Sequence, residues 1–349
     1  MSDVVPPDDP RTVIRDLRQR VKRLHRRVLE PDLLRGQMAL RWPMVRHLAA
    51  GDAAVARKHR FADLSPAYAA AAAAAGAPLP SSRVMTLDGL TWHVPLTEPD
   101  NEAMVARALG HQDFPYRVIT QTRDAGIGGV MLDIGANIGR MSIPRVILGD
   151  ATVAYCAEPD PLNYACLMRN VRDNGLAGLV LPDHVAIGAS EGKVHLERAR
   201  SAGGHRVLSA GRTSRRETVE VPCLPLDTWV VRMGIPLDEV RFIKVDVQGS
   251  EVDVLRGGSH VLSQRHIAWQ LEIDLDTLAA RGYVAKVDLY PILQQHFTHF
   301  IDLNRHPITA RVRPIALLVE ALEYVSGGTG GRTDVVLFSL DPAVCELFA

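Results

Sequence analysis

The sequence is poor in lysine, cysteine and aromatic residues, and it has no long apolar run. Only five of its 40 basic residues are lysines, and aromatic residues make up 5% of its 349 positions. The four cysteines form no CxxC pair and no even spacing, which indicates buried or free thiols in a reducing compartment. The longest stretch of small apolar residues, 69–77, is too short to span a bilayer.

The chain also lacks net charge, because 40 acidic residues balance the 40 basic ones. A neutral molecule has no overall field that would attract nucleic acid or an anionic membrane, so we expect neither a nucleic-acid partner nor a membrane span. The start of the chain does not have the basic and then apolar pattern of a signal peptide. We therefore expect a cytoplasmic protein, and the abundance of alanine and arginine is typical of a bacterial one.

Residues 11–30 carry apolar side chains at alternating spacings of three and four, with basic residues between them. This pattern predicts a basic amphipathic helix. The helix could pack on its own domain or on a second subunit, giving a homo-oligomer, or it could lie on a membrane or nucleic acid. Residues 32–78 are also predicted to be helical, so we expect an N-terminal helical extension over residues 1–78 and a second domain over residues 79–349.

The second domain is predicted to begin with a β-hairpin over residues 83–95 that turns at Asp88-Gly89, followed by a short helix near residues 101–109. From Val130 onward, apolar strands alternate with helices, which predicts an α/β Rossmann-like fold with a mostly parallel, seven-stranded sheet and helices on both faces. The expected strands cover residues 130–133, 152–157, 179–187, 241–246, 267–273, 299–303 and 333–338, with shorter ones at 193–197 and 218–223.

A glycine loop follows the first of these strands. Gly135 and Gly139 are separated by three residues, which is not the G-x-G-x-x-G spacing of dinucleotide-binding proteins. Asp133 precedes the loop, and its carboxylate would repel a pyrophosphate but attract the ammonium of an amino-acid cofactor. S-adenosylmethionine has that ammonium and no phosphate, so we predict it as the cofactor. Asp133 could instead only cap the turn.

Glu158 ends the next strand, nineteen residues after Gly139. An acid at this place can accept hydrogen bonds from both hydroxyls of a ribose. Dehydrogenases and methyltransferases share this feature, so Glu158 indicates a nucleoside ligand without separating the two classes. A simple solvated charge at the end of a strand is the alternative.

Several separated motifs resemble the FkbM-type methyltransferases. They are Asp133-Ile134-Gly135-Ala136-Asn137-Ile138-Gly139, Glu158-Pro159, Ile243 to Glu251, Val254 to Gly257, and Gln270 to Ile273. The resemblance covers roughly residues 83–303, and one departure is Gln248, where the family often has glutamate. It implies a class I methyltransferase fold and transfer of a methyl group to a hydroxyl of a sugar, glycolipid or secondary metabolite. The expected cofactor-binding residues are Asp133, Gly135, Asn137, Gly139, Glu158 and Pro159.

The candidate catalytic residues are Asp246, Lys244 and Glu272. Strand alternation places Lys244 and Asp246 on one face, with Asp246 at the carboxyl end of its strand. Asp246 could remove the proton of the acceptor hydroxyl, and Lys244 could orient it or stabilise an oxyanion. Glu272 ends the next strand and could line the same pocket. The three could also form only a buried ionic network.

Other residues offer weaker candidates. His184, His195 and His205 are alternative bases, and no cluster has metal-ligand spacing, so we expect metal-independent transfer. Ser250 and Asp253 are expected to cap a helix. The arginine-rich, glycine-containing segment 198–216 could bind an anionic acceptor, or it could be a solvated loop.

Two other functions stay open. One is a nicotinamide-dependent oxidoreductase, which Asp133 and the glycine spacing disfavour. The other is a non-catalytic scaffold with a methyltransferase-like fold, recruited through the N-terminal helix. The acceptor of a methyltransferase, whether small molecule or glycan, is not identified by the sequence.

Overall fold

The structure is a computed structural model that describes residues 82–87, 90–95, 129–148, 150–198, 205–208, 214, 216–303, 312–319 and 332–339. The helices expected over residues 11–30, 32–78 and 101–109 lie outside the described residues. The division at residue 78 therefore stays a prediction.

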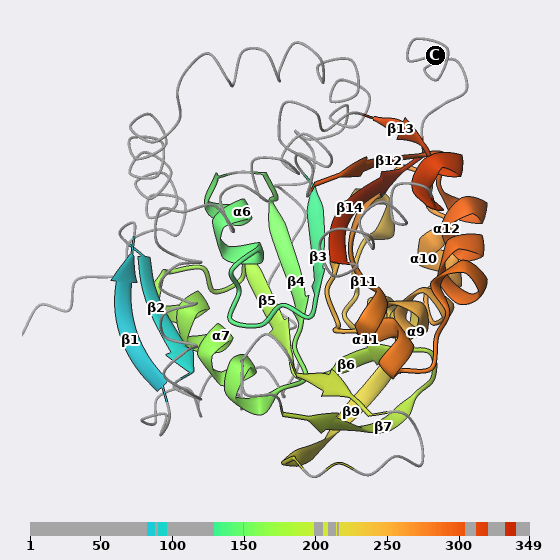
Figure 1. Cartoon of the computed structure of the whole chain (residues 1–349). Helices are drawn as coiled ribbons and strands as arrows, with labels where there is room; N and C mark the ends of the chain where they lie inside the picture. Colours follow the sequence, from blue (N-terminus) through green and yellow to red (C-terminus); the bar gives the residue numbers. More distant parts are fainter. Residues whose placement is uncertain are drawn as a thin grey trace, which may run out of the picture.

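The central element is an eight-stranded mixed sheet (Figure 1). Its spatial order is β13 (Arg313–Pro314), β12 (His299–Asp302), β14 (Arg332–Phe338), β11 (Ala268–Asp274), β10 (Val240–Val245), β3 (Val130–Ile134), β4 (Val153–Ala157) and β5 (Val180–Asp183). The strands from β11 to β5 are parallel, while β14 runs antiparallel to both β11 and β12. The expected α/β class is confirmed, but the count of seven strands is wrong because the two-residue strand β13 adds an eighth.

The strand order reverses beside β3. The chain adds β4 and β5 on one side of β3 and then returns to add β10 and β11 on the other side. In open α/β sheets, ligands bind at the carboxyl ends of the strands at such a point of reversal. The fold therefore places the candidate site at the ends of β3, β4 and β10.

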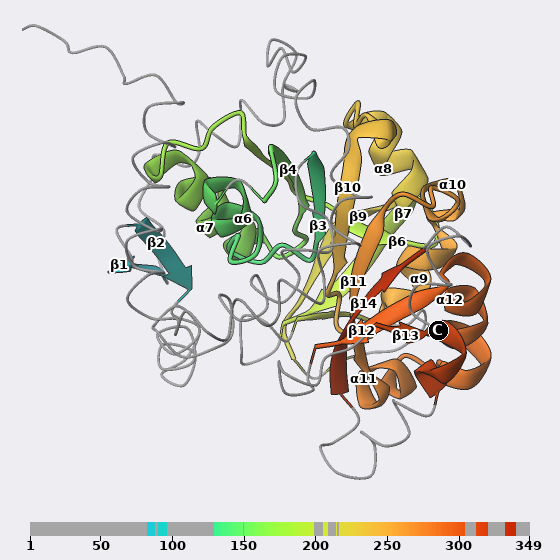
Figure 2. The same cartoon turned by 90° about the horizontal axis from the view of Figure 1, so that it is seen from above.

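Helices cover both faces of the sheet (Figure 2). One apolar cluster joins α6 (Ser142–Leu148) and α7 (Pro161–Asp173) to the sheet, and a second joins the sheet to the helices that follow residue 225. The helices of the second cluster are α8 (Leu226–Arg232), α9 (Glu251–Arg256), α10 (Ser259–Leu262), α11 (Leu275–Ala280) and α12 (Tyr290–His296). Three short helical segments accompany them: η4 (Leu237–Glu239), η5 (Ala285–Leu289) and η6 (Ile315–Leu317). All five residues of β3 are buried, as expected for a parallel strand covered on both faces.

Alternation along the strands sorts the polar side chains onto one face. Met131, Phe242 and Ala268 belong to the cluster of α6 and α7. Side chains two and four residues further along these strands share that face, because side chains alternate. This rule places Asp133, Lys244, Gln270 and Glu272 together on the face of α6 and α7.

A separate four-stranded sheet has the order β6 (Ala186–Gly188), β9 (Thr218–Pro225), β7 (Gly192–Glu197) and β8 (Arg206–Val207). The sequence predicted the strands at 193–197 and 218–223 but not β8, and it treated residues 185–187 as part of the same strand region as residues 179–181. The structure corrects this, because β6 pairs with β9 and only β5 pairs with β4.

The expected N-terminal hairpin is confirmed. Strand β1 (Ser82–Leu87) pairs antiparallel with β2 (Leu90–Pro95), and Leu87 faces Leu90 across the turn. Trp92 and Val94 are buried in the cluster that includes α7, and Figure 1 shows the hairpin lying along that helix. No helix in the described parts of the chain is long and apolar enough to cross a membrane.

Candidate active site

The glycine loop runs from the end of β3 across the neighbouring strand ends. Gly135, Asn137 and Gly139 have φ angles of 80°, 53° and 87°, in the region that favours glycine and tolerates asparagine. The amide groups of Gly135 and Ala136 both donate to the carbonyl of Ala157 at the end of β4. A Cβ atom on Gly135 would lie 1.9 Å from the carbonyl oxygen of Asp246, so this position has no room for a side chain.

Asp133 lies at the base of this loop and is fully buried. Burial raises the pKa of Asp133, while Lys244 and Ser142 oppose the shift. Among the described residues, neither carboxylate oxygen meets a hydrogen-bond partner of standard geometry. A buried carboxylate normally has such partners. The Asp133 carboxylate can therefore accept hydrogen bonds from a cation brought by a ligand.

Glu158 directly follows β4 and is only 5% exposed, so the alternative of a solvated charge at this strand end is wrong. Its Oε2 accepts the amide of Asn137 at 2.7 Å and its Oε1 accepts the amide of Asp160 at 2.8 Å. Burial raises the pKa of Glu158 to about 8, against the effect of these two amides. The contact with Asn137 ties the glycine loop to the end of β4.

Pro159 lies beside an aromatic pair. Nε2 of His184 is 2.9 Å from the Pro159 carbonyl oxygen, and the His184 ring stacks on Tyr164 with centroids 4.9 Å apart. The cofactor candidates Asp133, Gly135, Asn137, Gly139, Glu158 and Pro159 thus occupy the ends of two adjacent strands and the loop that joins them to α6.

The predicted catalytic residues are brought together. Nζ of Lys244 is 2.9 Å from Oδ2 of Asp246. The side-chain amide of Gln248 donates to Asp246 at 2.8 Å and to Glu272 at 2.6 Å. Gln248 also has a φ of 54°, a conformation that turns its side chain back over the strand ends. The departure from the family glutamate therefore places a neutral donor between two carboxylates.

The charges of this group act strongly on one another. Burial opposes ionisation of Asp246, but Lys244, Glu272 and Gln248 outweigh it and hold the pKa of Asp246 below its usual range. Burial also opposes the charge on Lys244, yet Asp246 and Asp133 raise the pKa of Lys244. Burial and then the charge of Asp246 raise the pKa of Glu272, against Arg332. The group therefore favours the charge on Asp246 over a charge on Glu272.

Sequence reasoning missed several members of this site. Arg140, next to Gly139, is half-buried, and the charge of Asp246 opposes the lowering of its pKa by desolvation. From β14, Arg332 forms an ion pair with Glu272, and Asp334 accepts from Gln270 at 3.3 Å. Only the position of Arg140 beside the glycine motif could have drawn attention to it. The β14 residues had no local signal, because their place depends on pairing with β11.

Ser250 occupies the N-cap of α9, as expected, but its side chain makes no capping hydrogen bond. Glu251 instead fixes the turn before the helix, since its Oε1 accepts the amides of Val247 and Gly249 at 3.3 and 3.1 Å. Asp253 binds Tyr283 and forms an ion pair with Arg281 at 2.5 Å.

The alternative histidines have other contacts. His195 lies on β7 opposite Glu220 in the second sheet, and His205 is 3.7 Å from Asp160. Among the residues that the structure describes, no group of three or more His, Cys, Asp or Glu could hold a metal ion. Cys156, Cys166 and Cys223 are buried free thiols, as expected, and Cys345 lies outside the described residues.

The arginine-rich segment 198–216 is described only in part. Arg198 forms an ion pair with Asp160 at 3.0 Å, and both Arg206 and Arg216 pair with Glu197. These three arginines therefore bind carboxylates of the protein itself. Arg200, Arg212 and Arg215 lie outside the described residues.

The strand order, the helices on both faces, and a glycine loop flanked by two acids define a class I methyltransferase fold. A family model described as the methyltransferase FkbM domain matches residues 133–302, which confirms the resemblance of the motifs. Residues 133–302 thus resemble an FkbM-type methyltransferase domain, and S-adenosylmethionine is the cofactor of that family.

Solved structures show remote similarity. A methyltransferase FkbM from Methylobacillus flagellatus KT is 16% identical, with 60% of this chain and 44% of that chain covered and a TM-score of 0.37. The Bacillus subtilis tRNA methyltransferase TrmK is 13% identical, with 66% and 68% covered and a TM-score of 0.34. A precorrin-6y C5,15-methyltransferase from Geobacter metallireducens is 13% identical, with 64% and 86% covered and a TM-score of 0.33.

The chain spans less than half the length of the FkbM structure that it matches. No curated protein sequence matches the chain. Similarity at these levels carries no information about the acceptor.

Proposed function

We propose that the protein is an S-adenosylmethionine-dependent methyltransferase that transfers a methyl group to a hydroxyl of a small-molecule or glycan acceptor. The observation that carries the proposal is the buried carboxylate of Asp133, which has no partner of standard geometry among the described residues and lies beside the glycine loop. Ser142 gives it only weak hydrogen bonds, and leaving such a group incompletely paired costs about 1–3 kcal/mol. The ammonium of the cofactor's amino-acid part would satisfy it.

Glu158 supports the same proposal. A carboxylate offers about four lone-pair positions, and the amides of Asn137 and Asp160 use two of them. The others are available to the hydroxyls of a ribose. A nicotinamide dinucleotide would share this contact, but its pyrophosphate would lie close to the Asp133 carboxylate. The arrangement therefore favours a sulfonium cofactor over an oxidoreductase.

The chemistry would take place on the α6 and α7 side of the strand ends. S-adenosylmethionine supplies a methyl group on a positively charged sulfur, and an acceptor oxygen in line with that bond displaces it. Asp246 is 32% exposed in its side chain and faces this end, so it can orient an acceptor hydroxyl and receive its proton. Lys244 holds Asp246 in place and ionised.

The presence of this whole group weighs against a non-catalytic scaffold. Lys244, Asp246, Gln248 and Glu272 come from two strands and the loop after β10, and they converge within hydrogen-bond distance. A scaffold without an acceptor would not need Asp246 exposed at this end. The anionic character of the acceptor, and a homo-oligomer formed through the N-terminal helix, remain part of the proposal.

Calorimetric titration of the full chain tests the cofactor. We expect S-adenosylmethionine to bind and NAD not to bind. Replacing Asp133 by Ala should weaken S-adenosylmethionine binding by roughly 2–4 kcal/mol, the loss expected for a charge-assisted contact in a desolvated site.

The matched control is Glu220→Ala, which removes an exposed carboxylate that pairs with Lys193 in the second sheet. It should bind the cofactor as the wild type does. Unchanged affinity in a correctly folded Asp133→Ala protein would remove the basis of the proposal, and so would binding of NAD in preference to S-adenosylmethionine.

A further inference from the structure

We propose that Asn170 is a positioning residue for the cofactor loop, and that it couples the order of this loop to the docking of the β1–β2 hairpin. The proposal rests on the proposed function, since it assigns a role in binding S-adenosylmethionine. It concerns the hydrogen bonds that join α7 to the glycine loop and to β2, which no sequence motif links.

The open edge of β2 is covered by a helix. Thr91 and His93 are two residues apart, so their peptide groups face the same edge of the strand, about 6.8 Å apart. Asn170 and Asn174 are one helical turn apart on α7, with a rise of about 6 Å between them. The two spacings match closely, and each asparagine can therefore pair with one peptide group of β2.

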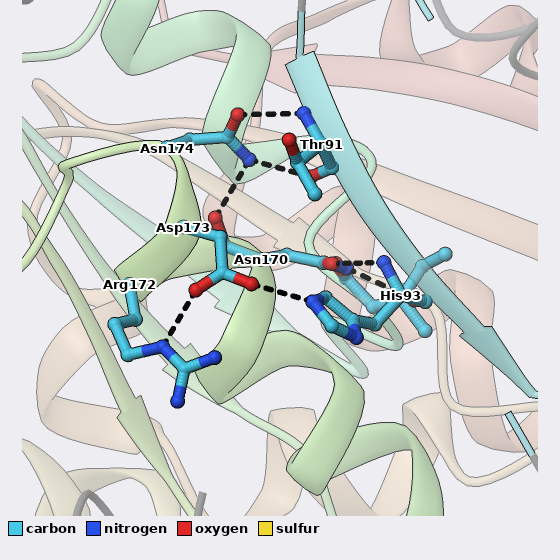
Figure 3. A network of polar contacts seen from close by, with 7 residues as sticks. Thr91, His93, Asn170, Arg172, Asp173 and Asn174 are labelled. Carbon is cyan, nitrogen blue, oxygen red and sulfur yellow. Dashed lines mark hydrogen bonds and ion pairs between the residues drawn. The ribbon is translucent and has the colours of Figure 1, made fainter. Parts of the chain in front are cut away.

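The contacts follow this match (Figure 3). Oδ1 of Asn174 accepts the Thr91 amide at 2.9 Å, and its Nδ2 donates to the Thr91 carbonyl at 2.7 Å. Oδ1 of Asn170 accepts the His93 amide at 2.5 Å, and its Nδ2 donates to the His93 carbonyl at 3.3 Å. The two side chains act like a neighbouring strand and satisfy an edge that would otherwise be unpaired.

Only one of these two asparagines also reaches the glycine loop. Nδ2 of Asn170 donates to the carbonyl of Ile138 at 2.8 Å, whereas Nδ2 of Asn174 turns to the carbonyl of Asn170 in its own helix. Ile138 lies between Asn137 and Gly139, which both have positive φ angles. Asn170 therefore fixes a peptide group in the part of the loop whose conformation is least favourable.

A charged contact reinforces the docking. Nε2 of His93 is 2.6 Å from Oδ2 of Asp173, and Oδ1 of Asp173 accepts from Arg172 at 2.6 Å (Figure 3). Asn170 itself is fully buried, so its amide cannot exchange these partners for water. The hairpin precedes the matched methyltransferase segment, which begins at residue 133. The support of the cofactor loop thus includes residues outside that segment.

The test compares Asn170→Ala with Asn174→Ala in the full chain. Both variants remove the same kind of contact with β2, but only the first removes a contact with the loop. We expect Asn170→Ala to speed hydrogen exchange of the amides over residues 136–139 and to weaken S-adenosylmethionine binding about tenfold, because a buried carbonyl loses its donor. Asn174→Ala should speed exchange at Thr91 and affect the loop and the cofactor affinity clearly less than Asn170→Ala does, because the bonds of Asn170 to His93 and Ile138 keep the hairpin docked.

Equal effects of both variants on the loop would overturn the proposal, as would a loop in Asn170→Ala that exchanges like the wild type. Asn170→Asp is the second variant, because it keeps the acceptor for the His93 amide and loses the side-chain donor, whose shorter bond is to Ile138 at 2.8 Å and whose longer bond is to His93 at 3.3 Å. It should disturb the loop more than β2.

If neither Asn170 variant folds, exchange of the wild-type chain in mild urea decides the question. Coupling predicts that the loop and β2 amides open with the same free energy, and opening of β2 alone at lower free energy would contradict it. If the wild type does not bind S-adenosylmethionine, the proposed function fails, and the exchange data still decide the positioning role.

Discussion

At the scale of the residue, one substitution tests whether Asp246 has a catalytic role or only a structural one. Asp246→Asn keeps the shape and the hydrogen bonds of the side chain but removes its basicity. If Asp246 receives the acceptor proton, kcat should fall about 10²–10⁴-fold, with cofactor affinity almost unchanged. Enzyme kinetics, cofactor titration and a thermal melt of one preparation measure all three quantities.

A purely structural Asp246 gives a different result. Lys244 forms an ion pair with Asp246 at 2.9 Å, and its charge would lose much of its compensation. The melting temperature would then fall, and the residual activity would follow the folded fraction. Normal kcat in Asp246→Asn would direct attention to His184.

Glu272 provides a second prediction at this scale. Burial and the charge of Asp246 raise the pKa of Glu272 against its ion pair with Arg332, which favours the neutral form and makes Glu272 a weaker candidate for the base than Asp246. We expect Glu272→Gln to retain kcat within about tenfold, since the amide replaces a neutral carboxyl group of similar shape. A loss as large as that of Asp246→Asn, measured at pH 7.5, would make Glu272 the base instead.

The single residues show where sequence reasoning succeeds. Asp133, Glu158 and Lys244 could be placed because each lies at a fixed position on a strand or directly after it. Gln248 and Arg332 could not, because their roles depend on a positive φ and on the pairing of β14 with β11. Ser250 lies at the N-cap as predicted, but its capping bond is absent, and a neighbouring carboxylate, Glu251, accepts the amides of the preceding turn.

At the scale of the element, the turn between β10 and α9 predicts a pH dependence of stability. Glu251 is buried, and burial raises its pKa from 4.5 to about 7, against the amides that it accepts. The folded state thus holds a proton that the unfolded state has lost. The associated stability is present below pH 4.5 and is lost as the pH rises towards 7, on the order of 3 kcal/mol in all.

Glu251→Gln should remove this part of the pH dependence. Urea unfolding at pH 5 and pH 8 measures it, and the fall in the free energy of unfolding should be smaller in the variant than in the wild type. Glu220→Gln, at an exposed site, serves as the control and should follow the wild type. A variant that loses as much stability as the wild type between the two pH values would contradict the assignment.

The positions of the strands were easier to predict than which strands pair with one another. The apolar runs around Val130, Val153, Val240 and Ala268 identify strands because each is buried on both faces. Strands β6 to β9 alternate less clearly, and nothing local says that they leave the main sheet. Their assignment needed the pairing of β6 with β9, which joins residues more than thirty positions apart.

At the scale of the whole molecule, the arginine-rich segment 198–216 is the candidate contact with the acceptor. Arg206 and Arg216 both form ion pairs with Glu197, so these two arginines attach the segment to the end of β7. Neutralising Arg206, Arg212 and Arg215 together should raise the acceptor KM and leave cofactor affinity unchanged. Arg206→Ala alone is the control for the lost ion pair with Glu197. An equal loss of cofactor affinity in the triple variant would show that the segment does not bind the acceptor.

The close approach of Gly135 to the Asp246 carbonyl has a consequence for the evolution of this protein. The amide of Asp246 also donates to the Ile134 carbonyl at 3.0 Å, so the two segments are in contact at consecutive residues. A change of backbone on either side must be accommodated by the other. Tight binding of the methyl donor and correct placement of the acceptor cannot be selected independently here. A new acceptor is therefore more easily acquired by changing the segments around this contact than by changing the contact itself.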